Sequence, residues 1–532
     1  MSSSDTVGTR ICLSGYLGTV RYVGTVDGTK GAWLGVEWDD PSRGRHDGSK
    51  DGRSYFTCLI PGAGSFIRPS QSIDYGRPFL RALTEKYIEI PHGSSAHEIV
   101  VLGSSNGAIQ VEAVNLDKIR GKFARIERLR EVSLDRENVS SVDPPGQIRD
   151  KCGNVRGVDL SSSLIPSWDV VALIAVELPL LERLSLNNNR LNPFTNPSLV
   201  IQAFSRLTEL QLNGTLITWE AMINIISLIP TLRQIEMGYN RLTSLSTAKT
   251  PERSTVNVEI INLDGNQLSD WINVSAGLCA FPNLSRLIVS ANPLASIPVF
   301  SAFQEPLHLK HLALSSTSIS TWASIDALVQ WCPELETLSL SSTPLVKDSV
   351  TGRAWRQHAI ARLPVLRALD GTQISTRERT DSELFYLSHI SHLDYPSPEA
   401  RLADHPRWDA LCHLHGVPDQ PSIKRPKDDR LSGRLIGITA RLSPTAPPPQ
   451  SPSELASPIS VRILPTAPLR HLRLKLLKSF KAPRGAAATV WMRMADGRLA
   501  RIGEPDGSED GREVDWWLEE GAEVVVHVES SR

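Results

Sequence analysis

The residues best suited to chemistry stand in one short loop near the amino terminus. Between Gly44 and Gly48 the sequence is Gly-Arg-His-Asp-Gly, which presents Arg45, His46 and Asp47 in succession. A guanidinium and an imidazole donate hydrogen bonds to anionic or polar groups, and the guanidinium does so with a full charge. Turns with positive φ explain the two glycines, but they do not explain the basic residue, the histidine and the acid between them. The loop therefore predicts a binding site.

Phosphate binding is the main alternative for this loop, because Gly48-Ser49-Lys50 has the appearance of a P-loop. A P-loop needs Gly-x-x-x-x-Gly-Lys-Ser/Thr, and here Ser49 separates the glycine from the lysine while Asp51 follows it. The sequence also contains no metal-ligand spacing, Ser/His/Asp arrangement or paired-carboxylate motif. We therefore expect no enzyme activity and no cofactor.

Aromatic residues and short strands surround the loop. Trp33 lies in the run Trp-Leu-Gly-Val-Glu-Trp, and Phe66 lies in Gly-Ser-Phe-Ile-Arg-Pro. Residues 8–75 consist of such β-rich runs broken by glycines, without helical periodicity. Closely spaced strands and turns of this kind predict a small all-β barrel.

The order of these pieces resembles the CAP-Gly domain, a small SH3-like barrel whose signature reads Gly-Lys-Asn-Asp-Gly. Arg45 stands at the lysine position and His46 at the asparagine position. In that family the loop and the neighbouring aromatic residues bind an acidic-aromatic carboxyl terminus, such as Glu-Glu-Tyr or Glu-Glu-Phe. The resemblance implies the same peptide-binding role for Trp33, Arg45, His46, Asp47, Gly48 and Phe66.

The middle of the chain is an internal repeat. From Val155 to Leu345 the pattern L-x-x-L-x-L-x-x-N-x-L recurs, and its second apolar position falls at residues 158, 184, 210, 235, 261, 287, 312 and 338. One such unit cannot bury its own apolar face, so the units must stack into a leucine-rich-repeat solenoid of α/β type. Tryptophans recur in register after the motif and predict convex-side core. They are Trp168, Trp219, Trp271 and Trp322.

The residues between the leucines face the concave surface of such a solenoid. Their charges have both signs and form no catalytic cluster, so this face predicts a protein-binding surface rather than a purely structural one. The candidate contact residues are Arg183, Glu209, Gln211, Glu236, Asp264, Arg286 and His311.

The rest of the chain divides around these two modules. We expect a CAP-Gly domain at 1–78, a linker and amino-terminal cap of the solenoid at 79–150, and repeats with a carboxy-terminal cap at 151–395. Residues 396–458 are rich in proline and serine and predict a linker. Strand-like and helical runs in 459–532 resemble an α+β ubiquitin-like β-grasp domain, which would be a docking module.

Composition limits the remaining possibilities. The chain has 532 residues, 57 Lys and Arg and 58 Asp and Glu, for a formal charge of −1. This balance argues against nucleic acid or an anionic membrane as a partner. The six cysteines are scattered, which excludes zinc-finger spacing and suits a reducing compartment. No apolar stretch is long enough to cross a bilayer.

The order of CAP-Gly domain, leucine-rich repeats and ubiquitin-like tail resembles the tubulin-folding cofactor E family. The resemblance implies a cytoplasmic, cytoskeleton-associated chaperone that binds the tail of α-tubulin with its barrel and the body of α-tubulin with its solenoid. It also implies work with cofactors B, C and D and β-tubulin in assembly and dissociation of the heterodimer, and a link from the tail domain to the proteasome or ubiquitin pathway. A microtubule adaptor or scaffold with a CAP-Gly domain, without chaperone activity, is the alternative.

Overall fold

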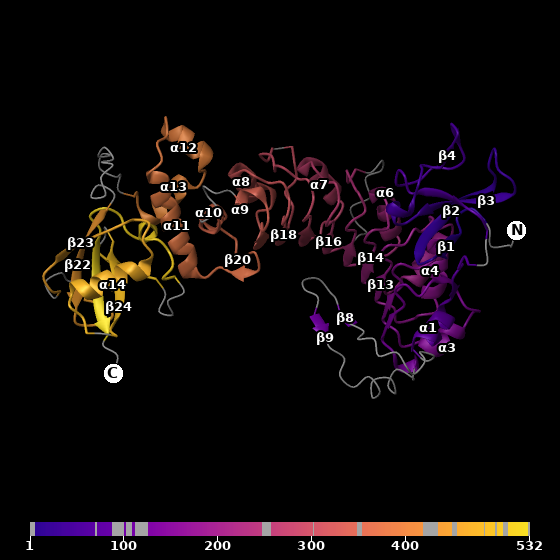
Figure 1. Cartoon of the computed structure of the whole chain (residues 1–532), viewed down its shortest axis with the longest axis horizontal. Coiled ribbons are helices and arrows are strands. Elements are labelled where there is room, and N and C mark those ends of the chain that lie inside the picture. The colour runs from indigo at the N-terminus through magenta and orange to yellow at the C-terminus, as the bar shows by residue number, and fades with distance from the viewer. Residues whose placement is uncertain are drawn as a thin grey trace. The chain divides into compact units, whose positions relative to one another are not determined.

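The computed structural model divides into two compact units, residues 1–419 and 420–532 (Figure 1). It describes residues 6–69, 72–87, 100–102, 109–111, 126–246, 257–301, 303–347, 354–418, 435–449, 455–483, 485–494, 497–503 and 509–529. Within these ranges, none of the helices has the length and apolar character needed to cross a membrane.

The first unit begins with the predicted barrel. Four antiparallel strands form its main sheet in the order β1-β2-β3-β6. They are β1 (Arg10–Leu13), β2 (Tyr16–Thr25), β3 (Ala32–Trp38) and β6 (Gly64–Ile67). A short 3-10 helix, η1 (Pro41–Arg43), and the paired strands β4 (Ser49–Lys50) and β5 (Arg53–Ser54) flank the Gly-Arg-His-Asp-Gly loop. Alternate residues of β2 and β3, such as Val20, Leu34 and Val36, are fully buried and form the core.

The barrel is fastened to the start of the solenoid. Strand β7 (Arg77–Pro78) pairs in parallel with β11 (Val139–Ser141), and helix α1 (Phe79–Tyr87) buries Phe79 and Leu83 in the solenoid core. The Arg10 guanidinium is buried and donates to Asp39 at 2.7 and 2.5 Å, and Arg190 of the solenoid lies 3.9 Å from the same carboxylate. A carboxylate shared by two cations, one of them buried, fixes the barrel against the first repeats.

The solenoid has one continuous sheet of eleven strands. All neighbours are parallel except the final pair, and the central residue of each strand from β12 to β19 is one of the predicted inward positions, from Val158 to Leu338. The strands are β10 (Glu131–Ser133), β12 (Gly157–Asp159), β13 (Arg183–Ser185), β14 (Glu209–Gln211), β15 (Gln234–Glu236), β16 (Ile260–Asn262), β17 (Arg286–Ile288), β18 (His311–Ala313), β19 (Thr337–Ser339), β20 (Ala368–Leu369) and β21 (Thr372–Gln373).

Buried asparagines join consecutive turns. The side chain of Asn266 accepts from the backbone of Asn240 at 2.9 Å and donates to the carbonyl oxygens of Met237 and Leu263, both at 2.9 Å. Asn189, Asn240 and Asn292 bond the backbone in the same way. Because these side chains satisfy buried backbone groups of the adjoining repeat, the motif asparagine has a structural role.

Helices cover the opposite side of the sheet (Figure 1). Four of them begin at the recurring tryptophans: α4 (Trp168–Ala175), α6 (Trp219–Ile226), α7 (Trp271–Leu278) and α8 (Trp322–Trp331). The first three tryptophans are buried in the core, and Trp322 is partly buried against it. The convex-side prediction is therefore confirmed. Shorter helical segments complete this side: η2 (Ile126–Arg128), α3 (Gln147–Cys152), α5 (Pro197–Ala203) and α9 (Pro344–Lys347).

Four helices close the far end of the solenoid: α10 (Trp355–Arg362), α11 (Thr376–Ser391), α12 (Pro398–Asp404) and α13 (Trp408–His415). The last two lie in the stretch predicted to be a linker. They form because Trp408 and Leu411 pack with Tyr386 and Ile390 of α11 in a small apolar core. The cap therefore extends beyond residue 395, where the loss of the repeat period had suggested that it ended.

The second unit also contains a strand in that predicted linker. Strand β22 (Ile436–Ser443) is an interior strand, next to the edge, of a five-stranded sheet of order β23-β22-β26-β24-β25. The others are β23 (Ile459–Ile463), β24 (Ala487–Arg493), β25 (Leu499–Ile502) and β26 (Glu523–Glu529), with helix α14 (Leu469–Ser479) and the short η5 (Val514–Trp516). Strand β22 pairs in parallel with β26, about eighty residues later. Its alternating apolar residues Ile436, Ile438, Ala440 and Leu442 are a local strand signal, which the prolines and serines around them outweighed in the sequence prediction. A further hairpin joins β8 (Val100–Leu102) and β9 (Ile109–Val111) in the first unit.

Two buried histidines stabilise the cap in their neutral forms. His358 of α10 packs against Trp322, Tyr386 and His389, and its burial, with nearby positive groups, lowers its pKa to about 3. His405 receives a hydrogen bond from Arg362 at 3.1 Å, and burial followed by the charge of Arg362 lowers its pKa to about 4. Protonation of either ring would place a charge in this core.

The cap should therefore lose stability in mild acid. Both pKa values lie below the ordinary 6.5, so the unfolded chain takes up protons that the folded chain does not as pH falls from 6.5 towards 4. Stability should be complete above pH 6.5 and decline through that window. Thermal unfolding of His358→Phe should show a weaker pH dependence, while the exposed control His413→Phe should follow the wild-type curve. Parallel curves for all three proteins would contradict the assignment.

Candidate functional site

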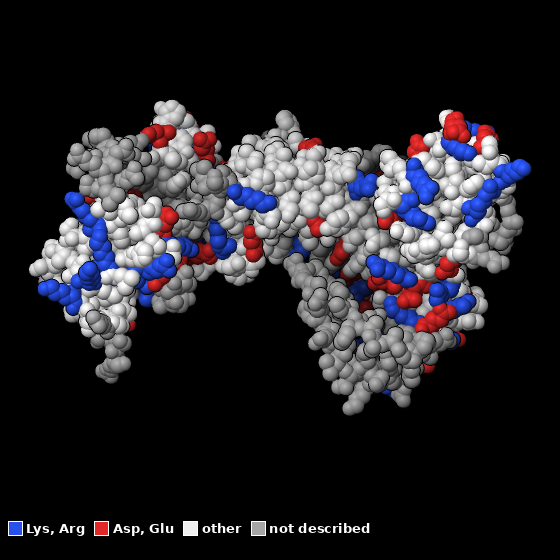
Figure 2. All heavy atoms as spheres, in the orientation of Figure 1, with Lys and Arg blue, Asp and Glu red and all other residues white. Residues whose placement is uncertain are grey.

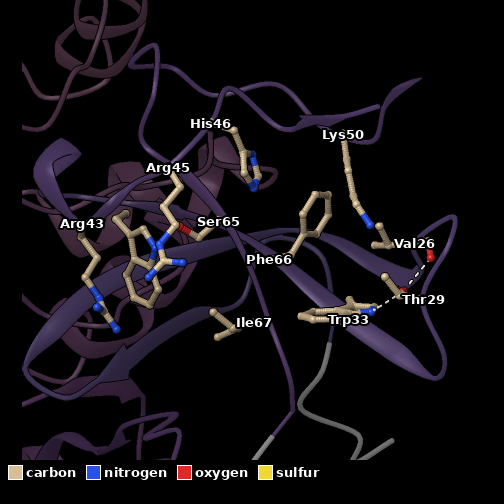
Figure 3. Close-up of a pocket in the computed structure, with 11 residues that line it drawn as sticks. Val26, Thr29, Trp33, Arg43, Arg45, His46, Lys50, Ser65, Phe66 and Ile67 are labelled. Carbon is tan, nitrogen blue, oxygen red and sulfur yellow. Dashed lines mark hydrogen bonds between the residues drawn. The ribbon is translucent and has the colours of Figure 1, made fainter. Parts of the chain in front are cut away.

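A cavity of about 390 Å³ opens on the barrel at the Gly-Arg-His-Asp-Gly loop (Figure 3). Strand β3 supplies Trp33, β6 supplies Phe66, and the loop between η1 and β4 supplies Arg45 and His46. Segments separated by more than thirty residues thus meet at one place, because β3 and β6 are adjacent antiparallel strands.

Aromatic side chains form the floor of this cavity. The ring of His46 lies 4.9 Å from that of Phe66, and Tyr55 and Phe56 meet Phe66 edge-on at 5.4 and 5.6 Å. The Trp33 indole N–H donates to the Thr29 hydroxyl at 2.7 Å, which fixes the orientation of its ring. These contacts hold a preformed apolar surface that suits an aromatic side chain.

Cations surround the aromatic surface, as Figure 3 shows for Arg43, Arg45 and Lys50. The Arg43 guanidinium lies over the rings of Tyr16 and Trp38, at 4.8 and 5.1 Å, which positions it at the cavity. Among the described residues that line the cavity there is no Asp or Glu. The electrostatic preference of the cavity is therefore for an anionic ligand.

Arg68 adds a further positive charge beside Trp33. Its guanidinium lies 3.8 Å from the centre of the Trp33 ring and donates to the Ala32 carbonyl oxygen at 3.1 Å. A stacked guanidinium keeps its outward N–H groups available while its position is fixed.

The loop itself is shaped by its glycines and by Asp47. Gly48 has φ +102°, and a Cβ atom there would lie 2.0 Å from the Phe56 carbonyl oxygen, so only glycine fits. A Cβ atom on Gly44 would lie 2.0 Å from the Gly62 carbonyl oxygen. Asp47 accepts hydrogen bonds from the backbone and the hydroxyl of Ser49, at 3.1 and 2.5 Å. These three residues shape the loop and do not line the cavity.

His46 is held as a neutral hydrogen-bond acceptor. Its Nδ1 atom accepts from the Gly48 backbone N–H at 3.0 Å. Burial lowers the pKa of His46, and the nearby Asp47 carboxylate offsets only part of that effect. The imidazole therefore braces the loop with one nitrogen while its ring extends the aromatic surface.

Of the six predicted peptide-binding residues, the structure brings four into the cavity: Trp33, Arg45, His46 and Phe66. Asp47 and Gly48 support the loop instead. The remaining lining residues were not singled out from the sequence. Which of their side chains point into the cavity depends on how the strands and loops fold together, and no local motif indicates it. They are Val26, Thr29, Trp38, Arg43, Lys50, Ser65 and Ile67.

The predicted concave residues lie on or beside the outward face of the solenoid strands. Three pairs of them lie opposite each other on neighbouring strands. The pairs are Arg183 with Glu209, Gln211 with Glu236, and Arg286 with His311. Asp264 comes after the end of β16, where burial raises its pKa.

Many of these polar groups already bond one another within the sheet. Arg183 pairs with Glu131, Gln211 accepts from Ser185 at 2.9 Å, and Asn213 donates to Glu236 at 3.0 Å. Apolar Ile260 and Ile288 interrupt the rows and were not predicted. The face is thus a mixed surface of polar, charged and apolar side chains.

Across the residues that the structure describes, no three or more His, Cys, Asp or Glu side chains converge as metal ligands.

Comparison with known proteins decides the family. A family model described as the CAP-Gly domain matches residues 7–72. Tubulin-specific chaperone E of Xenopus laevis is 32% identical over 496 residues, covering 90% of this chain and 91% of its own length. The chain belongs to the tubulin-specific chaperone E family. The Danio rerio member is 34% identical over 82% of this chain and 85% of its own, and tubulin-folding cofactor E of Arabidopsis thaliana is 30% identical over 80% and 81%.

One solved structure is similar to part of this chaperone E family member. It is described as the Bik1 CAP-Gly domain with ETF peptide from Bim1, is 35% identical, and covers 12% of this chain and 75% of its own, with a TM-score of 0.11.

The loop geometry predicts that Gly48→Ala disrupts the cavity of this family member. The added Cβ would meet the Phe56 carbonyl oxygen at 2.0 Å in a backbone conformation that alanine rarely adopts. The cost should be about 2 kcal/mol or more, measured as faster hydrogen exchange of β2 and β3. The matched control is Gly52→Ala, also at positive φ but with nothing within 4 Å, which should cost only about 1 kcal/mol. Equal protection of β2 and β3 from hydrogen exchange in the two variants would show that the contact between residue 48 and the Phe56 carbonyl oxygen is unimportant.

Proposed function

We propose that this protein is a tubulin-folding cofactor whose barrel binds the acidic-aromatic carboxyl terminus of α-tubulin. The observation that carries the proposal is the cavity, which joins an aromatic floor to Arg43, Arg45 and Lys50 without an acidic lining residue. Its relatives are named tubulin-specific chaperone E and tubulin-folding cofactor E. The site matches a ligand that ends in glutamates and one aromatic ring.

The energetics suit a reversible contact. Charge-assisted hydrogen bonds contribute about 1.5–3 kcal/mol each. Two or three of them, with burial of a ring against Trp33 and Phe66, support affinity on the order of micromolar, about −8 kcal/mol. Such a site captures a tail and still releases it.

The solenoid would supply the second contact, with the body of α-tubulin on its strand face. The junction at Asp39, with Arg10 and Arg190, holds the barrel on the solenoid, so both contacts belong to one unit. A weak contact tethered beside another gains effective concentration, and the pair holds a client more firmly than either alone.

The cofactor would act without an enzymatic step. A protein that prefers isolated α-tubulin to the heterodimer shifts that equilibrium by its differential affinity, and with β-tubulin and cofactors B, C and D the same preference serves assembly. This role belongs in the cytoplasm, in association with the cytoskeleton.

The second unit would be a ubiquitin-like β-grasp that docks partners, including the proteasome or ubiquitin pathway. Its support is the sheet order β23-β22-β26-β24-β25 with β22 and β26 parallel in the middle and α14 packed on one face. The antiparallel pair of β22 and β23 would be the first hairpin of that fold.

Purified α/β-tubulin separates a chaperone from an adaptor. The full-length protein, mixed with heterodimer and resolved by size-exclusion chromatography, should yield a complex with α-tubulin alone and lower the amount of polymer that sediments. Bovine serum albumin serves as the inert control for polymer loss. Co-sedimentation with intact microtubules, without loss of polymer, would overturn the chaperone role and favour the adaptor.

Removing one cation from the cavity should weaken tail binding. Arg45→Ala should lower the affinity for a peptide ending in Glu-Glu-Tyr about tenfold, the loss of one charge-assisted hydrogen bond, as measured by calorimetry. Added salt should reduce wild-type binding in the same direction. Arg206→Ala, an exposed arginine of the solenoid, should bind as wild type. Equal affinity for a peptide without its tyrosine would contradict the aromatic floor.

A further inference from the structure

The second unit carries a concentrated positive face. Five exposed cations gather along helix α14 and the neighbouring strand β23, and Figure 2 shows lysine and arginine atoms clustered over this part of the molecule. They are Arg462, Arg470, Lys475, Lys478 and Lys481. We call this set the α14 face. None of the five forms an ion pair with another residue that the structure describes.

The face is held rigidly by the helix that bears it. Leu469, Leu472 and Leu476 of α14 are fully buried against the sheet, so the other side of the helix must point outward. Lys475 donates to the carbonyl oxygen of Arg462, which ties the helix stripe to strand β23. The cations of α14 and Arg462 of strand β23 therefore form one continuous positive surface.

Two features give this surface more than charge. Leu474, which is 62% exposed, lies on the same side of the helix as the cations and adds an apolar contact to the surface. Strand β23 is the edge of its sheet and, among the described strands, pairs only with β22. Apart from the Arg462 carbonyl oxygen, which accepts from Lys475, the backbone groups on its outer edge can pair with another strand.

We propose that the α14 face binds an acidic polypeptide segment in extended form, which adds to the edge of β23. Its carboxylates would meet the lysines of α14, and one apolar side chain would cover Leu474. Backbone pairing and the leucine favour a polypeptide over nucleic acid or an anionic membrane, which need charge but no strand edge. This inference extends the proposed docking role of the second unit and does not depend on the ligand of the barrel.

The test uses the full-length protein and a probe that the barrel should not hold. The probe is an acetylated, amidated peptide, Glu-Glu-Asp-Leu-Glu-Glu-Asp, with no aromatic residue and no terminal carboxylate. Fluorescence anisotropy should detect binding, and Lys475→Glu with Lys478→Glu should weaken it at least about tenfold. Arg206→Glu with Lys347→Glu, two exposed cations of the first unit, is the charge-matched control and should bind within about twofold of wild type.

Further arms make the result decisive. Arg45→Ala should leave this peptide's affinity unchanged, which separates the α14 face from the barrel. Arg470→Glu with Lys481→Glu should repeat the loss if the first variant does not fold, as judged by circular dichroism. Wild-type affinity in both charge-reversal variants would overturn the proposal. So would tighter binding of a single-stranded oligonucleotide or phosphatidylserine vesicles through the same lysines.

Discussion

No single repeat of this chain can bury its own apolar face, and the rest of the first unit follows from that constraint. Stacking buries the central apolar residue of each strand from β12 to β19 and leaves the side chains on either side of it outward. The same stacking creates buried backbone groups at each turn, which asparagines such as Asn240 and Asn266 satisfy. The proposed recognition and the stability of the solenoid would thus use opposite faces of the same three-residue strands.

An open stack has two exposed ends, and both ends recruit other parts of the chain. At the beginning, α1 inserts Phe79 and Leu83 into the core and draws the barrel into contact with the first repeats. Asp39, between Arg10 and Arg190, completes that contact. At the other end, α10 to α13 cover the final strands. Closing the stack therefore also joins the barrel to the first repeats.

The barrel and the second unit offer related chemistry by different means. In the barrel, cations stand around a preformed aromatic cavity, which suits a short anionic terminus with one ring. On the α14 face, cations lie along a helix beside an edge strand, which suits an extended segment. The two sites would thus distinguish acidic ligands by shape rather than by charge.

The sequence by itself determined the repeat period, the inward leucines, the tryptophan helices and the aromatic and basic residues of the loop. These features are local or strictly periodic, so their physical reasons can be read from spacing alone. Tertiary structure decided the rest. Arg43 and Lys50 reach the cavity only because η1 and β4 fold back over β3, and Asp47 is turned away by its bonds to Ser49. Helices α12 and α13 and strand β22 form because distant residues pack and pair with them, which composition alone cannot show.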